Sequence, residues 1–291
     1  MKYAFIRKFS SQYRVEKLCS VLKVSRSGYY KWLKHKPSRQ EKRRNKLKKR
    51  IQHHFYAFKK RDGSPKIAAK LRQEGWVVST RTVSRLMKEM SLRSVVVKKH
   101  KATTNSKHNH PVYENVLNRN FKVLAPNQVW VSDITYIQTQ QGWVYLASVM
   151  DLFSRKIVGW AAGDRITKEL ALRAFDMACE RRKPPAGLIH HSDRGSQYAS
   201  TEYRQRIKEM KMVGSMSRKG NCYDNACIES FHSVLKKELI YQTKFKTRLQ
   251  AYDALYKYIE LEYNLIRLHS TLGYLPPHRF EKEYHKQLQA S

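Results

Sequence analysis

Residues 129–239 alternate between strand-like and helix-like segments in an order that few folds accommodate. Three segments rich in β-branched and aromatic residues follow one another, at residues 129–137, 143–150 and 155–160, and such residues are typical of strands. Short turns separate them, so we expect an antiparallel meander. Beyond it the pattern predicts helix, strand, helix, strand and helix at residues 167–181, 188–191, 201–210, 212–216 and 224–239. We therefore expect a mixed α/β layer.

The charge of the chain is strongly positive and unevenly distributed. Fifty-nine Lys and Arg against 23 Asp and Glu give +36 over 291 residues, and residues 1–117 alone carry 32 basic and 6 acidic groups. Such an excess indicates a polyanionic partner. A basic front half joined to a nearly balanced back half indicates a nucleic-acid-binding part joined to something else. The alternative is a solubilising or ribosome-associated surface.

Membrane and zinc sites find no support in the sequence. No stretch approaches the roughly 20 apolar residues of a membrane span, and residues 1–8 lack the apolar region of a signal peptide. Cys222 and Cys227 form a C-x4-C pair, but no second Cys or His pair nearby completes a zinc site. We therefore expect a cytoplasmic protein with free thiols and no membrane partner, associated with the nucleoid when bound to DNA.

Basic helical segments precede the α/β part. Apolar residues recur at helical spacing over residues 14–33, and Ser25 is placed to cap the second of two short helices. In so basic a context this pattern favours a helix-turn-helix, with a plain helical hairpin as the alternative. The charge run at residues 36–50 is interpreted as a linker leading into a basic helix, and a second helical unit follows from Ile51.

The last helix of that second unit, residues 79–89, has the character of a DNA-recognition helix. Its apolar residues face inward, which places Arg81 and Arg85 on the outer face. Arginine contacts both phosphates and guanine edges. An ordinary solvated basic face is the alternative for either residue.

The composition divides the chain into four parts. We expect a helix-turn-helix-like segment at residues 1–45, a second helical DNA-binding domain at 46–100, a basic linker at 101–117, and the α/β core with a C-terminal helical extension at 118–285. The linker is polar and has no periodicity. Its pair of histidines, His108 and His110, is interpreted as exposed rather than as metal-binding.

Three acidic residues, Asp133, Asp193 and Glu229, are candidate ligands for divalent metal ions. Asp133 lies in an apolar strand, where an ionised carboxylate is costly unless it is paired or bound to metal. Asp193 ends another strand, and Glu229 lies in a helix among apolar neighbours. Hard oxygen ligands suit Mg²⁺ or Mn²⁺, and two such ions can activate the attacking oxygen and stabilise the leaving one in phosphoryl transfer. Any one acid alone is more often a salt-bridge partner, but the set favours metal.

The spacing and surroundings of these acids resemble a known family. Thirty-five residues separate Asp193 from Glu229, and the acids stand in the motifs WVSDITY (130–136), HSDRGSQY (191–198) and NCYDNACIESF (221–231). These motifs resemble the D,D-(35)-E family of retroviral integrases and bacterial insertion-sequence transposases. Within it the chain is similar to the second-frame (OrfB) subunit of transposases made from two overlapping frames. Motifs at residues 25–32 and 263–277 extend the resemblance nearly end to end.

The resemblance implies a fold and an activity. The fold is a ribonuclease-H-like α/β catalytic core with N-terminal all-α helix-turn-helix domains. The activity is that of a DDE transposase, a two-metal polynucleotidyl transferase, which cuts DNA at element ends and directs the freed 3′-OH at a second phosphodiester. Asp133, Asp193 and Glu229 would position two Mg²⁺ or Mn²⁺ ions, and none of them would be the nucleophile. Lys236 lies seven residues after Glu229 on the same helical face, where the family places a basic residue that contacts DNA near the scissile phosphate.

Neighbours of the three acids are secondary candidates. Asn225 precedes Glu229 by one turn, and Gln197 and Tyr198 follow Asp193. We expect these three to orient groups in the site or to contact DNA.

Other polar residues near the site are expected to have structural roles. Asp151 is interpreted as a turn residue, and Asp224 as the cap of the helix that carries Glu229. The remaining ones are expected to be paired or satisfied without touching substrate: His190, His191, Glu238 and Glu262.

The resemblance also implies partners. They are DNA (the terminal inverted repeats of the element and the target), a homodimer or higher assembly on DNA, and an upstream-frame product or fusion that supplies a further helix-turn-helix and a coiled-coil zipper. No heptad run appears in this chain.

Two other functions remain open. A DNA-binding regulator could keep the fold without catalysis, but the intact triad and Lys236 argue against it. A ribonuclease-H-type nuclease is disfavoured by the basic helical units and the tail motif.

Overall fold

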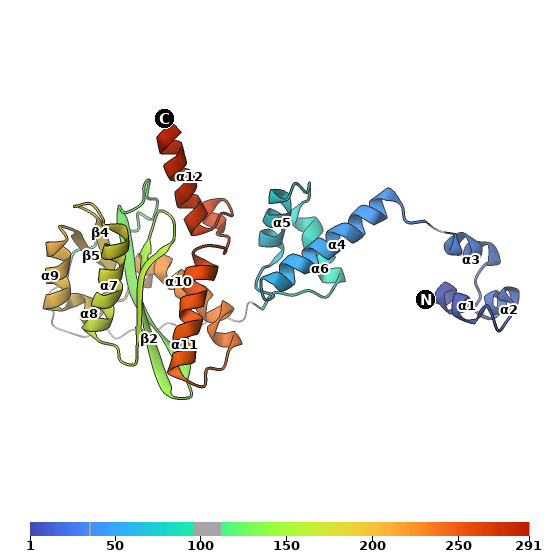
Figure 1. Cartoon of the computed structure of the whole chain (residues 1–291), viewed down its shortest axis with the longest axis horizontal. Coiled ribbons are helices and arrows are strands. Elements are labelled where there is room, and N and C mark those ends of the chain that lie inside the picture. Colours follow the sequence, from blue (N-terminus) through green and yellow to red (C-terminus); the bar gives the residue numbers. More distant parts are fainter. Residues whose placement is uncertain (35, 96–111, 291) are drawn as a thin grey trace.

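The computed structural model describes residues 1–34, 36–95 and 112–290. Their buried side chains form one cluster in each of two small helical units and two clusters in a larger α/β core. Figure 1 shows the three parts in chain order, from the N-terminal helices to the sheet and its covering helices. Among the described helices, none has the length and apolar character needed to cross a bilayer.

The first unit consists of three short helices, α1 (Lys2–Phe9), α2 (Val15–Val21) and α3 (Arg26–Leu33). They pack around the buried side chains of Ile6, Cys19 and Tyr29. The expected cap is confirmed, because the Ser25 side chain accepts a hydrogen bond from the Gly28 backbone N–H at 3.1 Å. Helix α1 was not anticipated from the sequence.

The second unit also has three helices, α4 (Arg39–Ala57), α5 (Ser64–Gln73) and α6 (Thr80–Glu89). Helix α5 carries Pro65 in its first turn, where the missing N–H costs nothing. Helix α6 is capped by Ser79, whose side chain accepts from Thr82 N. Its inner residues Val83 and Leu86 are buried against the other two helices.

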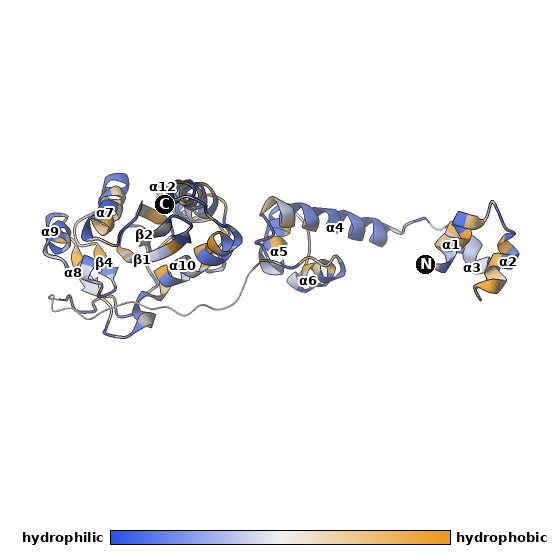
Figure 2. Cartoon of the chain, turned by 90° about the horizontal axis from the view of Figure 1, so that it is seen from below, coloured by the Kyte–Doolittle hydropathy of each residue, from blue (hydrophilic) through white to orange (hydrophobic). Residues whose placement is uncertain are grey.

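The basic helix expected after a linker in residues 36–50 is present, but it begins earlier than expected and takes up most of that segment. Helix α4 begins at Arg39 with a capping box, in which Ser38 and Glu41 each accept the other's backbone N–H. The expected domain boundary between residues 45 and 46 therefore falls inside a continuous helix. Only the stripe of Leu47, Ile51 and Phe55 is apolar, and the rest of α4 is mostly hydrophilic (Figure 2), which hides its helical period in the sequence.

The core contains a five-stranded mixed sheet with the order β3-β2-β1-β4-β5. Its strands are β1 (Val129–Thr139), β2 (Gly142–Asp151), β3 (Ile157–Gly163), β4 (Ile189–Ser192) and β5 (Val213–Met216). The first three pair antiparallel in sequence order, which confirms the meander. Strand β4 then pairs parallel with β1, and β5 pairs parallel with β4. This arrangement is the ribonuclease-H-like fold.

Helices cover both faces of the sheet. They are α7 (Lys168–Arg182), α8 (Ser196–Ala199), α9 (Thr201–Glu209), α10 (Ala226–Glu238) and α11 (Arg248–Tyr256). Helix α12 (Pro277–Ala290) packs instead against the turn that follows β2, where Ser154 Oγ donates to Glu281 Oε1 at 2.8 Å. Shorter turns link the later ones: the 3-10 turns η1 (Cys222–Asn225), η2 (Ile240–Gln242) and η4 (Ser270–Leu272), and the π-helix η3 (Lys257–Tyr263).

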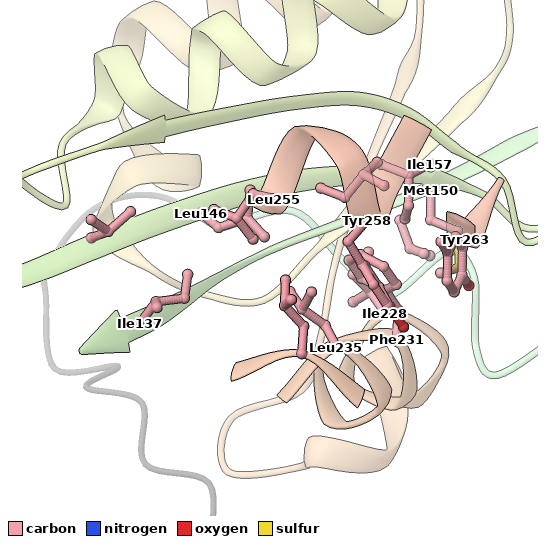
Figure 3. Close-up of a cluster of buried hydrophobic side chains, with 14 of the residues drawn as sticks. Ile137, Leu146, Met150, Ile157, Ile228, Phe231, Leu235, Leu255, Tyr258 and Tyr263 are labelled. Carbon is pink, nitrogen blue, oxygen red and sulfur yellow. The ribbon is translucent and has the colours of Figure 1, made fainter. Parts of the chain in front are cut away.

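The alternation of β1 side chains separates two hydrophobic clusters. Trp130 belongs to the cluster that includes α7, whereas Val131 and Ile137 belong to the one that includes α10 and α11. Figure 3 shows this second cluster between the strands and the helices α10, α11 and η3. Because neighbouring strand residues point to opposite faces, the position of Asp133 on β1 decides that its side chain lies on the α10 side.

The second helical unit contacts the C-terminal part of the core. Arg61 and Lys59 both form ion pairs with Glu262 on η3. Lys66 Nζ lies 3.7 Å from Glu238 Oε1, at the end of α10. Arg267 forms a further ion pair with Glu238 at 3.0 Å. The expectation that Glu238 and Glu262 are paired is therefore confirmed.

Candidate active site

Asp133 and Asp193 leave the sheet side by side. Strands β1 and β4 are parallel neighbours, and their last paired residues are Ser132 and Ser192. The next residue of each chain segment is an aspartate. The pairing register thus brings together two carboxylates that lie 60 positions apart in the sequence.

Glu229 lies on helix α10, which packs against β1 and brings this residue near Asp133 and Asp193. The Asn225 side chain fixes the start of this helix, since its Nδ2 donates to the backbone carbonyl of Ser132 at 3.0 Å. This bond ties the first turn of α10 to the residue that precedes Asp133. The helix therefore presents Glu229 toward the ends of β1 and β4.

The three carboxylates influence one another electrostatically. Burial, together with the charges of Asp133 and Glu229, raises the pKa of Asp193 to about 7, although the Gly195 backbone N–H that it accepts opposes this. Burial and the charge of Asp133 also raise the pKa of Glu229 to about 7. Like charges held together in a partly desolvated site are a feature typical of catalytic centres.

The donor set fits a divalent cation. Carboxylate oxygens are the ligands that Mg²⁺ and Mn²⁺ prefer, and a cation between them would remove the repulsion that raises both pKa values. Within residues 1–34, 36–95 and 112–290, no three His, Cys, Asp or Glu side chains are gathered closely enough to hold an ion as they stand. The chemistry of a metal site is present, and its oxygens would need to converge further around an ion.

His232 is a site residue that the sequence reasoning missed. Its Nδ1 lies 3.3 Å from Asp133 Oδ2, and its Nε2 lies 3.4 Å from the Ser148 hydroxyl on β2. Residues three apart on a helix share a face, so the position of His232 three residues after Glu229 was the available signal.

Lys236 lies on the same side of the core as the triad, as its spacing from Glu229 indicated. Its ammonium is 4.4 Å from the centre of the Tyr136 ring, a cation–π contact. Burial lowers the pKa of Lys236, while the charge of Asp133 acts to raise it. The lysine is therefore within electrostatic reach of the carboxylates.

Two of the three secondary candidates are not placed to contact DNA. Asn225 and Tyr198 are each 2% exposed, so neither presents a side chain with which to contact DNA. Asn225 instead holds α10 to β1, which is an orienting role. Tyr198 packs edge-to-face against Tyr203 within the hydrophobic cluster that includes α7. Gln197 is half-buried, and its Nε2 donates to the carbonyl of Ile166 at 3.4 Å.

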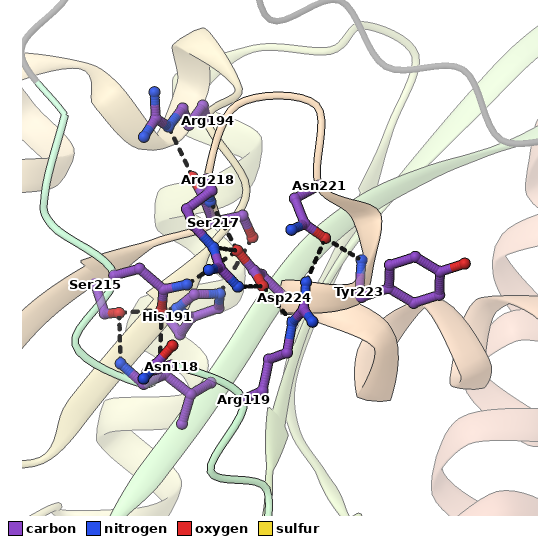
Figure 4. Close-up of polar contacts among 12 residues, drawn as sticks. Asn118, Arg119, His191, Arg194, Ser215, Ser217, Arg218, Asn221, Tyr223 and Asp224 are labelled. Carbon is purple, nitrogen blue, oxygen red and sulfur yellow. Dashed lines mark hydrogen bonds and ion pairs between the residues drawn. The ribbon is translucent and has the colours of Figure 1, made fainter.

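Asp224 does not cap α10, which is a correction of the expectation. Its fully buried carboxylate accepts hydrogen bonds from Arg218, Arg119 and Asn115, all between 2.8 and 2.9 Å. Figure 4 shows Asp224 at the centre of this network. The Arg218 guanidinium above all holds the pKa of Asp224 well below its usual range. The network fixes the loop that leads into α10.

The other polar residues have the structural roles expected. His190 lies between Ser132 Oγ and the Tyr203 hydroxyl, and His191 lies between Ser215 Oγ and Ser217 Oγ. Burial lowers the pKa of His190 to about 3 and that of His191 to about 4.

Asp151 is a turn residue, as expected. Its buried carboxylate accepts backbone N–H groups of Asn127 and Phe153. It lies on β2 outside the triad and has its own bonding partners.

Arg81 and Arg85 are exposed on α6, in the second helical unit. Arg85 lines a hollow between α6 and α4, together with Arg43 and Arg44. The helix that was expected to carry a recognition surface is therefore basic on its outer side. The histidines His108 and His110 lie outside the described residues.

Comparisons with known proteins agree with this architecture. Family models described as an integrase core domain match residues 124–222 and 211–277, and a model described as an HTH-like domain matches residues 42–100. The "Insertion element IS600 uncharacterized 31 kDa protein" of Shigella sonnei is 45% identical over 269 residues, which is 92% of this chain and 99% of that protein. The transposase InsF for insertion sequence IS3A of Escherichia coli is 40% identical over 285 residues, covering 97% of this chain and 99% of that protein. The chain therefore belongs to the insertion-sequence transposases with an integrase core, enzymes that cut and join DNA during transposition.

Proposed function

We propose that Asp133, Asp193 and Glu229 are the groups with which this transposase cuts the ends of its element and joins them to target DNA. The observation that carries the proposal is the meeting of the three acids at the ends of β1 and β4. The pKa values of Asp193 and Glu229, both raised to about 7, support it. A surface salt-bridge role would instead lower these values, because a basic partner favours the ionised carboxylate.

Each residue has a defined task in this proposal. Two bound Mg²⁺ or Mn²⁺ ions would supply Lewis-acid activation of the attacking and leaving oxygens. The carboxylates hold the ions, and none of them forms a bond to phosphorus. The Gly195 N–H orients Asp193, and His232 orients Asp133. Lys236 binds a phosphate beside the scissile one, since its ammonium lies at the rim of the same site.

The helical units and the excess of positive charge supply DNA binding. Arg81 and Arg85 on α6 would contact the terminal inverted repeats, and the basic residues of the front half would neutralise phosphates. Gln197, half-buried one turn after Asp193, would contact DNA only after a change of rotamer. The described unit that carries α6 begins at Arg39, so we place the boundary of this domain there.

Assembly completes the proposal. Joining two element ends requires two active sites on paired DNA ends, so the working form would be a dimer or a larger assembly on DNA. The upstream-frame product, free or fused to this chain, would supply a coiled-coil zipper and a further helix-turn-helix.

A cleavage and strand-transfer assay tests the triad. The full-length chain, with and without the upstream product, is given duplexes that carry the ends of its own element and Mg²⁺. Asp133→Asn, Asp193→Asn and Glu229→Gln should each abolish both cutting and joining. The matched control is Glu202→Gln, which alters an exposed carboxylate on α9 and should retain both.

Each other outcome selects a different function. Joining that survives the three substitutions would contradict the proposal. Cutting of RNA–DNA hybrids without joining would indicate the nuclease. Binding of the ends with no cutting by the unaltered chain, even with the upstream product, would indicate the regulator.

A further inference from the structure

Tyr136 and Trp143 on the β1–β2 hairpin form an exposed aromatic patch beside the active site, together with Tyr241 on η2, which lies close enough to interact electrostatically with Tyr136. Their exposed fractions are 36%, 43% and 44%. The rings of Tyr136 and Trp143 meet edge-to-face, with centroids 5.2 Å apart and planes at 87°. Large aromatic side chains gathered at the surface usually mark a binding site, because leaving them in water is unfavourable.

The strand register places two of these rings on one open face of the sheet. Trp143 pairs with Gln138, two residues beyond Tyr136 on β1, so the two aromatic side chains are diagonal neighbours on the same face. The hydrophobic cluster that includes α7 extends along this face only as far as Ile134 and Tyr145. The β1–β2 hairpin continues past the end of α7 (Figure 1), which leaves the aromatic patch uncovered by that helix.

A positive charge accompanies the patch. Lys236 Nζ lies 4.4 Å from the Tyr136 ring centre and interacts with the charge of Asp133. A cation next to an aromatic ring matches the two parts of one nucleotide, the anionic phosphate and the flat base. Single-stranded nucleic acid is bound in this way, by basic groups that follow the backbone and by aromatic rings on which bases stack.

The distance of the patch from Asp133 determines which nucleotides of the DNA can bind to it. Tyr136 is three residues after Asp133 on β1, a distance of roughly 10 Å along a strand. One strand of DNA advances about 3.4 Å per nucleotide. Asp133 and Tyr136 point to opposite faces of β1, but the pairing of β1 with β4 ends at Ser132, and Lys236 extends from α10 past this edge to the Tyr136 ring. A DNA strand that crosses this edge brings bases within about three nucleotides of the phosphate at Asp133 to the patch.

We propose that the aromatic patch binds unpaired bases of the element end, within about three nucleotides of the scissile phosphate. A base that stacks on Tyr136 or Trp143 must leave its duplex stack, so the proposal includes local opening of the DNA end. It rests on the proposed function, since it assumes that the scissile phosphate lies at the triad.

The test combines protein variants with DNA ends that lack one base. The full-length chain is assayed for cleavage of end duplexes with an abasic site at each of three positions on either side of the cut. At the stacked position the abasic site should slow cleavage about tenfold, and Trp143→Ala should slow cleavage of intact ends about tenfold. Cleavage of the abasic end by Trp143→Ala should be no slower than with either change alone, because both changes remove the same stacking contact.

Matched variants separate stacking from folding. Trp143→Phe and Tyr136→Phe keep a ring and should retain most activity, whereas Tyr136→Leu should behave like Trp143→Ala. Both substituted positions are exposed, so thermal unfolding of the four variants should be unchanged. An abasic site eight nucleotides from the cut is the control on the DNA.

The outcomes discriminate between the two proposals. Equal cleavage rates for Trp143→Ala and the unaltered chain would overturn the stacking site. It would also be overturned if Trp143→Ala acting on an abasic end were slowed about 100-fold, because the two changes would then act independently. If Glu229→Gln still cut these ends, the proposed function itself would fail, whatever the aromatic variants did.

Discussion

The imidazole of His232 connects the Asp133 carboxylate on β1 to Ser148 on the neighbouring strand β2. Its Nδ1 lies 3.3 Å from Asp133 Oδ2 on β1, and its Nε2 lies 3.4 Å from Ser148 Oγ on β2. Residues that orient metal-binding side chains in this way typically change metal affinity or activity by about 10–100-fold when removed. We therefore predict that His232→Ala lowers the cleavage rate at limiting Mg²⁺ by roughly 10-fold or more, measured as a Mg²⁺ titration of initial rates.

The conservative variant separates orientation from packing. Asn places an amide N–H close to the position of the imidazole Nδ1, so His232→Asn should recover much of the Mg²⁺ affinity. An unchanged Mg²⁺ dependence in His232→Ala would show that Asp133 needs no such support.

Metal binding should be strongly pH-dependent near neutrality. In the metal-free protein the pKa values of Asp193 and Glu229 are about 7, against ordinary values of 3.8 and 4.5. The folded state therefore retains protons that the unfolded chain releases between about pH 4 and 7, and these two groups make stability fall as pH rises through that window. Divalent cations require the ionised carboxylates. The increase in Tm caused by Mg²⁺ should therefore grow from pH 5.5 to about 7 and then level off.

An isosteric amide isolates this effect from other titrations. Asp193→Asn mimics the protonated carboxyl at every pH, so the metal-free variant should gain Tm relative to the unaltered chain as pH rises from 5.5 to 8. Its Tm should also respond little to Mg²⁺. A Tm difference between the two proteins that stays constant with pH would contradict the raised pKa of Asp193.

The sheet and the proximity of the three acids could be predicted because their signals are local or carried by motifs. The β-branched runs of β1 and β2 have a clear strand character, and the 35 residues between Asp193 and Glu229 are visible in the sequence. The start of α4 could not be predicted in the same way. Its buried stripe is diluted by the charged residues around Leu47 and Ile51, and the deciding signal was the pair Ser38 and Glu41.

The roles of single polar residues depend on partners far away in the chain. Asp224 was expected to cap a helix, but it binds Arg119, which is 105 residues away. Asn225 was expected to orient groups or to contact DNA, and its amide donates to the Ser132 carbonyl, which is 93 residues away. Local sequence patterns contain no information on such contacts. His232 was different, because its helical spacing from Glu229 was visible.

Close contact between β3 and α7 makes Gly159 intolerant of any side chain. A Cβ at this position would lie 2.2 Å from the carbonyl oxygen of Ala174 and 2.7 Å from the Cβ of Ala178. The nearest atom is backbone and cannot move aside without displacing the helix. Overpacking a core commonly costs about 1–3 kcal/mol, and we predict that Gly159→Ala lowers the free energy of unfolding by at least about 3 kcal/mol, measured by urea denaturation.

Gly163, on the same strand, provides the matched control. A Cβ there would lie 3.3 Å from the ends of the Arg173 and Leu170 side chains, and its nearest backbone atom would be the Arg165 oxygen at 3.9 Å. The two side chains need to shift by only a few tenths of an ångström, so Gly163→Ala should change stability by less than about 1 kcal/mol. Equal effects of the two substitutions would argue against the close contact of β3 with α7.

Arg81 and Arg85 should contribute to DNA affinity through phosphate contacts. Both are exposed on α6, and each phosphate contact to B-DNA adds about 0.9 to the slope of log K against log salt. Arg81→Ala and Arg85→Ala should therefore each weaken binding of the element ends and reduce that slope by about 0.9, measured by fluorescence anisotropy between roughly 50 and 200 mM salt.

Lys208→Ala is the control, because Lys208 is exposed on α9, on the other side of the core from the helical units (Figure 1). If Lys208→Ala changed the slope as much as the α6 variants, binding would reflect overall charge rather than a recognition surface on α6. If an arginine variant weakened binding to the element ends but not to unrelated DNA, that arginine would read bases, since phosphate contacts carry no sequence information.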